Sequence, residues 1–253
     1  MCEAASDSPT APICEAQLSF AGVLPKLVPT APVVLSGNLD VDVEARTSQS
    51  FALSEEELIE LTKQFLNVQF DFAGASNPNN LTLSDLLADN FEFWGPVVGP
   101  LGKDTFAEAF GSFKVADAFP DGKNDYYQFH RDPYDPARIW FITRFEGKNT
   151  GTLAGFLPAT NKKVETPPQA QSCTFNAQGQ ITKFTIGYVL DRNLGNTGGL
   201  GGVYGLFYAI GYGLPFPEGQ PWQPSPPYFL LTRGGRFVQD LLKPLQSVLP
   251  LSK

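Results

Sequence analysis

Few of the residue types that perform chemistry occur in this chain, and the most suggestive of them is the carboxylate Asp191. It ends a predicted strand, 180–191, in which apolar and polar residues alternate. A carboxylate in an apolar pocket is desolvated, which raises its pKa and suits it to proton transfer near neutral pH. The alternative is structural, because Asp191 could instead pair with Arg192 or cap the glycine-rich turn that follows. Both interpretations stay open.

A second polar group, Arg144, lies in a predicted strand over 138–146 that is otherwise rich in aromatic and β-branched residues. Arg144 shares one face of this strand with Trp140 and Ile142. From that face its guanidinium could hold an anionic or carbonyl oxygen of a ligand. A salt bridge or a position at the rim of the fold is the alternative.

Metal and nucleophile chemistry have little support in the composition. The 253 residues contain one His and three Cys, so we expect no zinc site of clustered Cys and His, and we predict no metal and no cofactor. His130, the single His, has no nucleophile motif beside it, so a hydrolytic triad is not expected. This leaves carboxylate chemistry or none.

The chain is acidic and rich in apolar rings. Its formal net charge of −8 argues against a nucleic-acid partner, and the 42% of hydrophobic residues, with 21 Phe, predict a folded core. We expect no membrane span, because the nearest candidate, 193–217, is uncharged but holds eight Gly and two Pro. That stretch is predicted to be a glycine-rich loop with an apolar turn. Residues 1–10 lack the features of a secretion signal, so we expect a soluble protein, cytosolic or organellar after leader removal.

Helices precede strands in the predicted order of elements. A Ser or Thr followed three residues later by an acidic residue marks helix starts at Ser54 and Thr82, and a third helix begins near Asp104. The apolar period then changes to two, which predicts strands at 126–130, 138–146, 169–176 and 180–191. This order predicts an α+β fold, with a curved antiparallel sheet wrapped around the N-terminal helices.

Three stretches, in this order, resemble the SnoaL-like group of the nuclear transport factor two-like superfamily. They are Leu87–Phe93 with Gly99–Lys103, Asn149–Thr152 with Pro158–Val164, and Gly179–Ile181 with Tyr188–Asp191. The resemblance covers about residues 52–195 and implies a cone-shaped domain with one deep apolar pocket. We therefore expect an extended N-terminal arm over 1–51, the SnoaL-like domain over 52–195, and a Gly-, Pro- and aromatic-rich tail over 196–253 that ends in a helix.

The resemblance also implies where a site would lie. Cyclases of this group resemble one another in an acid/base Asp at the end of the last strand, here Asp191, which Arg144 or Tyr188 would assist by orienting the ligand. Six residues are predicted to contact the ligand: Trp94, Tyr127, Trp140, Gly187, Tyr188 and Val189. Gly187 stands where many relatives carry a bulky aromatic residue, so it enlarges the pocket unless a neighbouring Phe or Trp fills the gap. The alternative for the aromatic residues in this set is that they are ordinary core residues.

Two functions of different classes fit these features. The first is a domain that binds a small or medium apolar ligand and, if catalytic, performs cofactor-free proton transfer of the isomerase, cyclase or lyase type. The second is a non-catalytic accessory or assembly subunit, whose arm and aromatic tail dock on a larger complex or on a second copy in a homodimer. Whether the protein is an enzyme stays open at this point.

Overall fold

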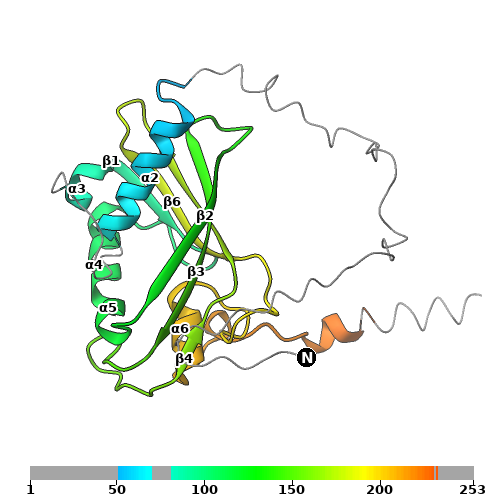
Figure 1. Cartoon of the computed structure of the whole chain (residues 1–253). Helices are drawn as coiled ribbons and strands as arrows, with labels where there is room; N and C mark the ends of the chain where they lie inside the picture. Colours follow the sequence, from blue (N-terminus) through cyan, green and yellow to red (C-terminus); the bar gives the residue numbers. More distant parts are fainter. Residues whose placement is uncertain (1–50, 70–80, 231, 233–253) are drawn as a thin grey trace, which may run out of the picture. The chain divides into compact units, whose positions relative to one another are not determined.

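A six-stranded sheet with helices on one side makes up most of the structure, a computed structural model that describes residues 51–69, 81–230 and 232 (Figure 1). The arm expected over 1–51 lies outside the described residues except for its last position. The helix expected at 236–249 also lies outside them. The described residues all belong to one packed unit of the chain.

The two expected helix starts are present. Helix α2, Glu55–Gln69, begins with a reciprocal pair in which the Ser54 backbone N–H donates to Glu57 Oε2 at 2.8 Å and the Glu57 N–H donates to Ser54 Oγ at 3.2 Å. Its apolar face buries Leu58 and Phe65 completely. The short helix α3, Leu83–Leu86, begins after Thr82, whose N–H donates to Asp85 Oδ2 at 2.8 Å.

The sheet contains six strands, and it confirms the expected α+β class. They are β1 (Leu87–Trp94), β2 (Lys123–Arg131), β3 (Arg138–Lys148), β4 (Lys163–Glu165), β5 (Gln169–Phe175) and β6 (Ile181–Val189). Their order is β1-β6-β5-β3-β2, and β4 pairs with the end of β3. The pairing is antiparallel as expected, with one exception: β1 runs parallel to β6. A parallel pair needs a long connection, and here the whole chain from β2 to β5 lies between β1, the edge strand, and its neighbour β6.

Phenylalanine side chains fill the space between the concave face of the sheet and the helices. Phe65 of α2 meets Phe184 of β6 with ring centroids 4.9 Å apart, and Phe106 lies 5.2 Å from Phe93 of β1. Phe106 belongs to α4, Lys103–Phe113, which follows close to the expected start. Phe65, Phe93, Phe106 and Phe184 therefore belong to the main apolar core.

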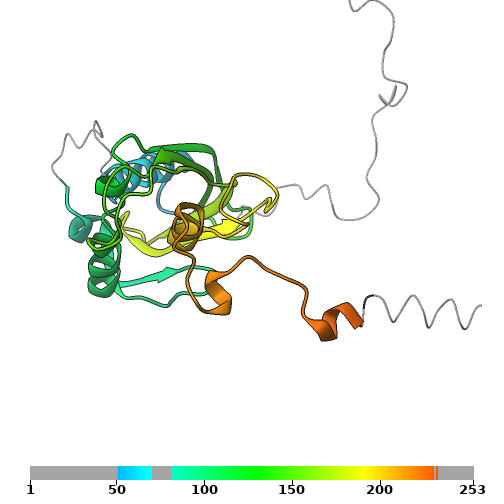
Figure 2. The same ribbon diagram turned by 90° about the horizontal axis from the view of Figure 1, so that it is seen from below.

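A helix that the sequence did not predict crosses the wide end of the curved sheet. Helix α6, Gly202–Ile210, lies inside the stretch expected to be a loop, and in Figure 2 it is seen nearly end-on inside the opening of the curved sheet. It buries Leu206, Phe207 and Ile210 in a second apolar cluster with residues of the sheet and of α5, Val115–Ala118. Packing of the domain thus continues past residue 195. No helix in the described ranges is both long and apolar enough to cross a bilayer.

Candidate functional site

A cavity of about 820 Å³ lies between α4 and α5 on one side and the ends of β1 and β6 with α6 on the other. Its walls are largely apolar side chains, among them Phe93, Phe110, Ile186, Val203 and Leu206. Cavities that bind small molecules typically measure about 300–1,000 Å³ and have mostly apolar walls. The size and lining therefore suit a small or medium apolar molecule.

Three of the predicted ligand contacts, Gly187, Tyr188 and Val189, line this cavity. They form the last three residues of β6. The Tyr188 side chain is 41% exposed, and its hydroxyl lies 3.4 Å from the Gly95 carbonyl oxygen to which it donates. Because that hydrogen bond is long, the Tyr188 hydroxyl is accessible to another partner.

Beside Gly187, which lines the cavity, lie the ring of Pro96 and the backbone at the start of α6, and not a Phe or Trp side chain. Gly187 has φ +89°, and a Cβ built on it would lie 3.2 Å from Pro96 Cδ and 3.6 Å from the Gly202 nitrogen. From the other side, a Cβ on Gly201 would lie 2.0 Å from the Gly187 carbonyl oxygen. The missing side chain thus lets the first turn of α6 approach β6.

The other three predicted contacts, Trp94, Tyr127 and Trp140, are not among the residues that line the cavity. Trp94 donates its indole N–H to Glu92 Oε2 at 3.0 Å. Tyr127 pairs with Ile142 on the face of the sheet opposite the core. All three side chains are only partly buried.

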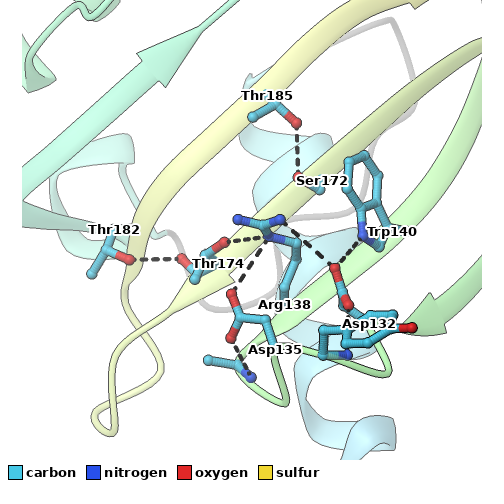
Figure 3. A network of polar contacts seen from close by, with 10 residues as sticks. Asp132, Asp135, Arg138, Trp140, Ser172, Thr174, Thr182 and Thr185 are labelled. Atoms are coloured by element: carbon cyan, nitrogen blue, oxygen red, sulfur yellow. Dashed lines mark hydrogen bonds and ion pairs between the residues drawn. The ribbon is translucent and has the colours of Figure 1, made fainter. Parts of the chain in front are cut away.

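Trp140 belongs to a polar network on that outer face (Figure 3). Its indole N–H donates to Asp132 Oδ2 at 2.7 Å, and the Arg138 guanidinium carbon lies 5.6 Å from the centre of its ring. Arg138 also pairs with Asp132 and Asp135 at 3.7 and 3.6 Å, and donates to Thr174 Oγ1 at 3.1 Å. These contacts fix the turn between β2 and β3 to the sheet.

Hydrogen bonds in this network act on the carboxyl group of Asp132. Partial burial favours its neutral form, but bonds donated by Trp140 and by the Tyr134 N–H, with the charge of Arg138, outweigh burial and hold the pKa of Asp132 below its usual value. The group is therefore an ionised structural partner. It does not have the properties of a proton-transfer acid.

Both predicted catalytic residues lie outside the residues that line the cavity. Asp191 Oδ1 accepts hydrogen bonds from the backbone N–H and the side-chain amide of Asn193, at 2.9 and 3.1 Å. This is the turn-capping arrangement that the sequence left open as the alternative. Arg144 is exposed on the outer face of β3, because Phe145 and Thr143 occupy the buried face.

The cavity also has polar lining residues that the sequence did not single out. Lys114 and Asp117 come from the junction of α4 and α5, Asn124 from the start of β2, and Glu218 from the turn after α6. Lys114 has φ +49°, which ends α4 and redirects the chain into α5. Helix periodicity gave no signal for these residues, because each lies at the end of an element. Within the described ranges no group of three or more His, Cys, Asp or Glu side chains could hold a metal ion.

Comparisons with known proteins gave matches among solved structures. No protein-family model and no curated protein matches the chain. A protein from Jannaschia sp. CCS1, named as a SnoaL-like polyketide cyclase, is 14% identical over 55% of this chain and 89% of its own, with a TM-score of 0.41. One from Agrobacterium tumefaciens, named as an isomerase of the SnoaL-like family, is 11% identical over 51% and 95%, with a TM-score of 0.35.

A third match, an NTF2-like protein of unknown function from Exiguobacterium sp. 255-15, is 17% identical over 49% of this chain and 93% of its own, with a TM-score of 0.35. These proteins bear the names of the group that the three sequence stretches resemble. The strand order and the helices against the concave face establish the α+β fold of the chain independently.

Proposed function

We propose that this α+β domain binds a small apolar molecule in the cavity between α4, β6 and α6. The observation that carries the proposal is the cavity itself, about 820 Å³ with walls of Phe, Ile, Leu and Val side chains. Apolar walls favour the transfer of a ligand out of water in proportion to the apolar area that is covered. Isolated polar groups at the ends of the cavity, such as Asn124 and Tyr188, would orient the ligand.

The proposed function is ligand binding, and no reaction is assigned to the protein. Asp191 already accepts two hydrogen bonds from Asn193, and Arg144 is on the other side of the sheet from the core. Proton transfer would require a group within hydrogen-bond reach of the ligand. Asp117 and Glu218, which line the cavity, are the carboxylates in reach of a bound molecule.

Binding can be tested with Nile red, a neutral apolar dye whose fluorescence rises in apolar surroundings. The double variant Ala107→Trp, Val203→Trp places large rings on opposite walls of the cavity, from α4 and α6. We expect the variant to bind the dye at least about tenfold more weakly, because the rings occupy the space of the ligand.

The matched control is the double variant Ser112→Trp, Tyr208→Trp. It places Trp on the same two helices at positions that do not line the cavity. We expect the control to bind the dye like the unchanged protein. Equal affinity of the first double variant and the unchanged protein would show that the dye, and the proposed ligand, bind elsewhere.

A further inference from the structure

The part of the chain that follows β6 is nearly uncharged. Residues 193–232 contain one charged residue, Glu218, whereas 17% of the whole chain is charged. This stretch includes α6, whose buried residues explain part of its apolar character. The remainder exposes large apolar side chains, and packing within the domain does not explain these.

We define the rim surface as six exposed apolar residues after β6: Leu190, Leu194, Phe216, Trp222, Tyr228 and Leu230. Their exposed fractions run from 39% for Phe216 to 73% for Leu230. Single exposed apolar residues are ordinary, but a group of them usually marks an interaction site. The rim surface is therefore a candidate for one.

Ring contacts hold two segments of the rim surface together. The Arg192 guanidinium carbon, in the turn that carries Leu190 and Leu194, lies 4.9 Å from the centre of the Trp222 ring. The Trp222 ring in turn meets the Tyr228 ring edge-on, with centroids 5.6 Å apart. The one cation in this turn is thus engaged with an aromatic ring.

The rim surface borders the cavity. Val189 lines the cavity, and Leu190 follows it directly in the chain. Tyr204, another lining residue, has its ring centroid 6.0 Å from that of Phe216. Glu218 lines the cavity two residues after Phe216. A partner that covers the rim surface would therefore lie at the mouth of the cavity.

We propose that the rim surface docks on an electrically neutral lipid bilayer, from which the cavity takes up its ligand. The choice of a bilayer over a protein rests on the proposed function, because an apolar ligand concentrates in lipid. Trp and Tyr side chains favour the membrane–water interface, where their rings meet both apolar and polar surroundings. The segments of the rim surface carry one cation, Arg192, and two carboxylates, Asp191 and Glu218, so a chain of net charge −8 gains nothing from anionic lipids, which repel the protein as a whole.

Vesicle binding tests the docking directly. The full chain is sedimented with phosphatidylcholine vesicles, and Tyr228→Glu is compared with Tyr134→Glu, a matched change at a 67% exposed tyrosine between β2 and β3. We expect Tyr228→Glu to weaken binding at least about tenfold and Tyr134→Glu to change it less than about twofold, because only the first places a charge in the interface. No binding of the unchanged chain to neutral vesicles, or equal effects of the two variants, would overturn the proposal.

The fluorescence of Trp222 gives a second readout. Phosphatidylcholine brominated near the headgroup should quench part of the tryptophan emission, and Trp222→Phe should remove that quenching while vesicle binding persists. Trp94 and Trp140, the other two tryptophans, should stay unquenched. Quenching that survives in Trp222→Phe would mean that another face meets the lipid, which overturns the proposal.

A second copy of the chain is the competing occupant. Light scattering that finds a dimer sensitive to Tyr228→Glu, without vesicle binding, would assign the rim surface to self-association and overturn the proposal. Nile red affinity, measured without vesicles, separates the two proposals. Loss of vesicle binding with dye binding intact overturns only the docking. Dye binding that ignores the cavity variants overturns the ligand site and, with it, the uptake of a ligand from the bilayer, whereas vesicle binding by the rim surface is read out separately.

Discussion

Gly187 and Gly201 meet backbone to backbone where α6 approaches β6. A Cβ on Gly201 would lie 2.0 Å from the Gly187 carbonyl oxygen, a distance that no carbon and oxygen can share. Gly201 has an ordinary φ of −98°, which any residue can adopt. The close contact therefore requires glycine at this position, and the backbone conformation does not require it. The position of α6, and with it one wall of the cavity, depends on this pair.

The first prediction is that Gly201→Ala destabilises the protein and weakens dye binding. The added methyl group must move α6 or β6, and overpacking of this kind costs about 3 kcal/mol. Urea unfolding measures the loss, and Nile red titration measures the effect on the cavity. Gly111→Ala is the matched control for the stability measurement alone, because nothing lies within 4 Å of its Cβ and Ala favours the interior of α4, whereas Gly111 itself lines the cavity.

The control Gly111→Ala should raise the free energy of unfolding by up to about 1 kcal/mol, whereas Gly201→Ala should lower it. A Gly201→Ala protein as stable as the unchanged one would show that α6 does not press against β6 as described.

The second prediction concerns the carboxylate that the sequence favoured. Asp191→Asn should leave Nile red affinity within about twofold, because the side chain caps a turn and does not line the cavity. Asp191→Ala removes both hydrogen bonds to Asn193 and should cost about 1 kcal/mol of stability. If Asp191→Asn abolishes dye binding without unfolding the protein, Asp191 belongs to the ligand site after all.

The third prediction is a loss of stability in acid that depends on Asp132. The lowered pKa of this group means that its stabilising contribution is complete above the unfolded value of 3.8 and is lost as the pH falls through the folded pKa. Urea midpoints at about pH 6 and about pH 3 should therefore differ less in Asp132→Asn than in the unchanged protein. Trp140→Phe should give an intermediate difference, since it removes one of the hydrogen bonds to the carboxylate.

Identical pH dependence in Asp132→Asn and the unchanged protein would contradict this account of the network. A measurement at about pH 6 alone does not test the pH dependence, because Asp132→Asn also removes the ion pair with Arg138 and so lowers stability at that pH.

The fourth prediction is that the Cys173 thiol reacts only when the domain unfolds. The side chain is completely buried on β5, and burial raises the pKa of the thiol well above its usual value, despite a hydrogen bond with Thr62. Iodoacetamide at about pH 8 should leave the Cys173 peptide unmodified in the native protein and modify it in urea. Mass spectrometry of the digested protein reads out both states, and rapid native labelling of Cys173 would contradict the packing of β5.

Much of the fold was predictable because local signals and tertiary packing agree in it. Ser54 and Glu57 cap α2 as the sequence indicates, and the alternation in 138–146 correctly separates two faces of β3. Helix α6 was not predictable in the same way. Gly205 would ordinarily weaken a helix, but here a Cβ on it would lie 2.5 Å from the Leu200 carbonyl oxygen, so glycine serves close packing. The nine residues of α6 include no charged residue and two glycines, so no charged face marks a helix in the sequence.

The candidate site was less predictable because alternation does not say which face of a strand is buried. Trp140 and Phe141 are both aromatic neighbours on β3, yet only Phe141 faces the core. On β2 the register shifts between Tyr127 and His130, and Gln128 has φ +56°. A bulge of this kind redirects the side chains that follow, and nothing in the local sequence marks it.

The parallel pairing of β1 with β6 sets an order for folding. Leu87 of β1 pairs with Ile181 of β6, so a chain that emerges from the ribosome cannot complete this edge until nearly the whole sheet has been synthesised. The antiparallel neighbours β5 and β6 are joined by a short turn and can form at once. We therefore expect β1, with α4 packed on it, to be added to a preformed sheet late in folding. A nascent chain stalled before residue 181 would leave the backbone edge of β1 without its partner strand, although Phe91 and Phe93 could already pack on Phe106 of α4.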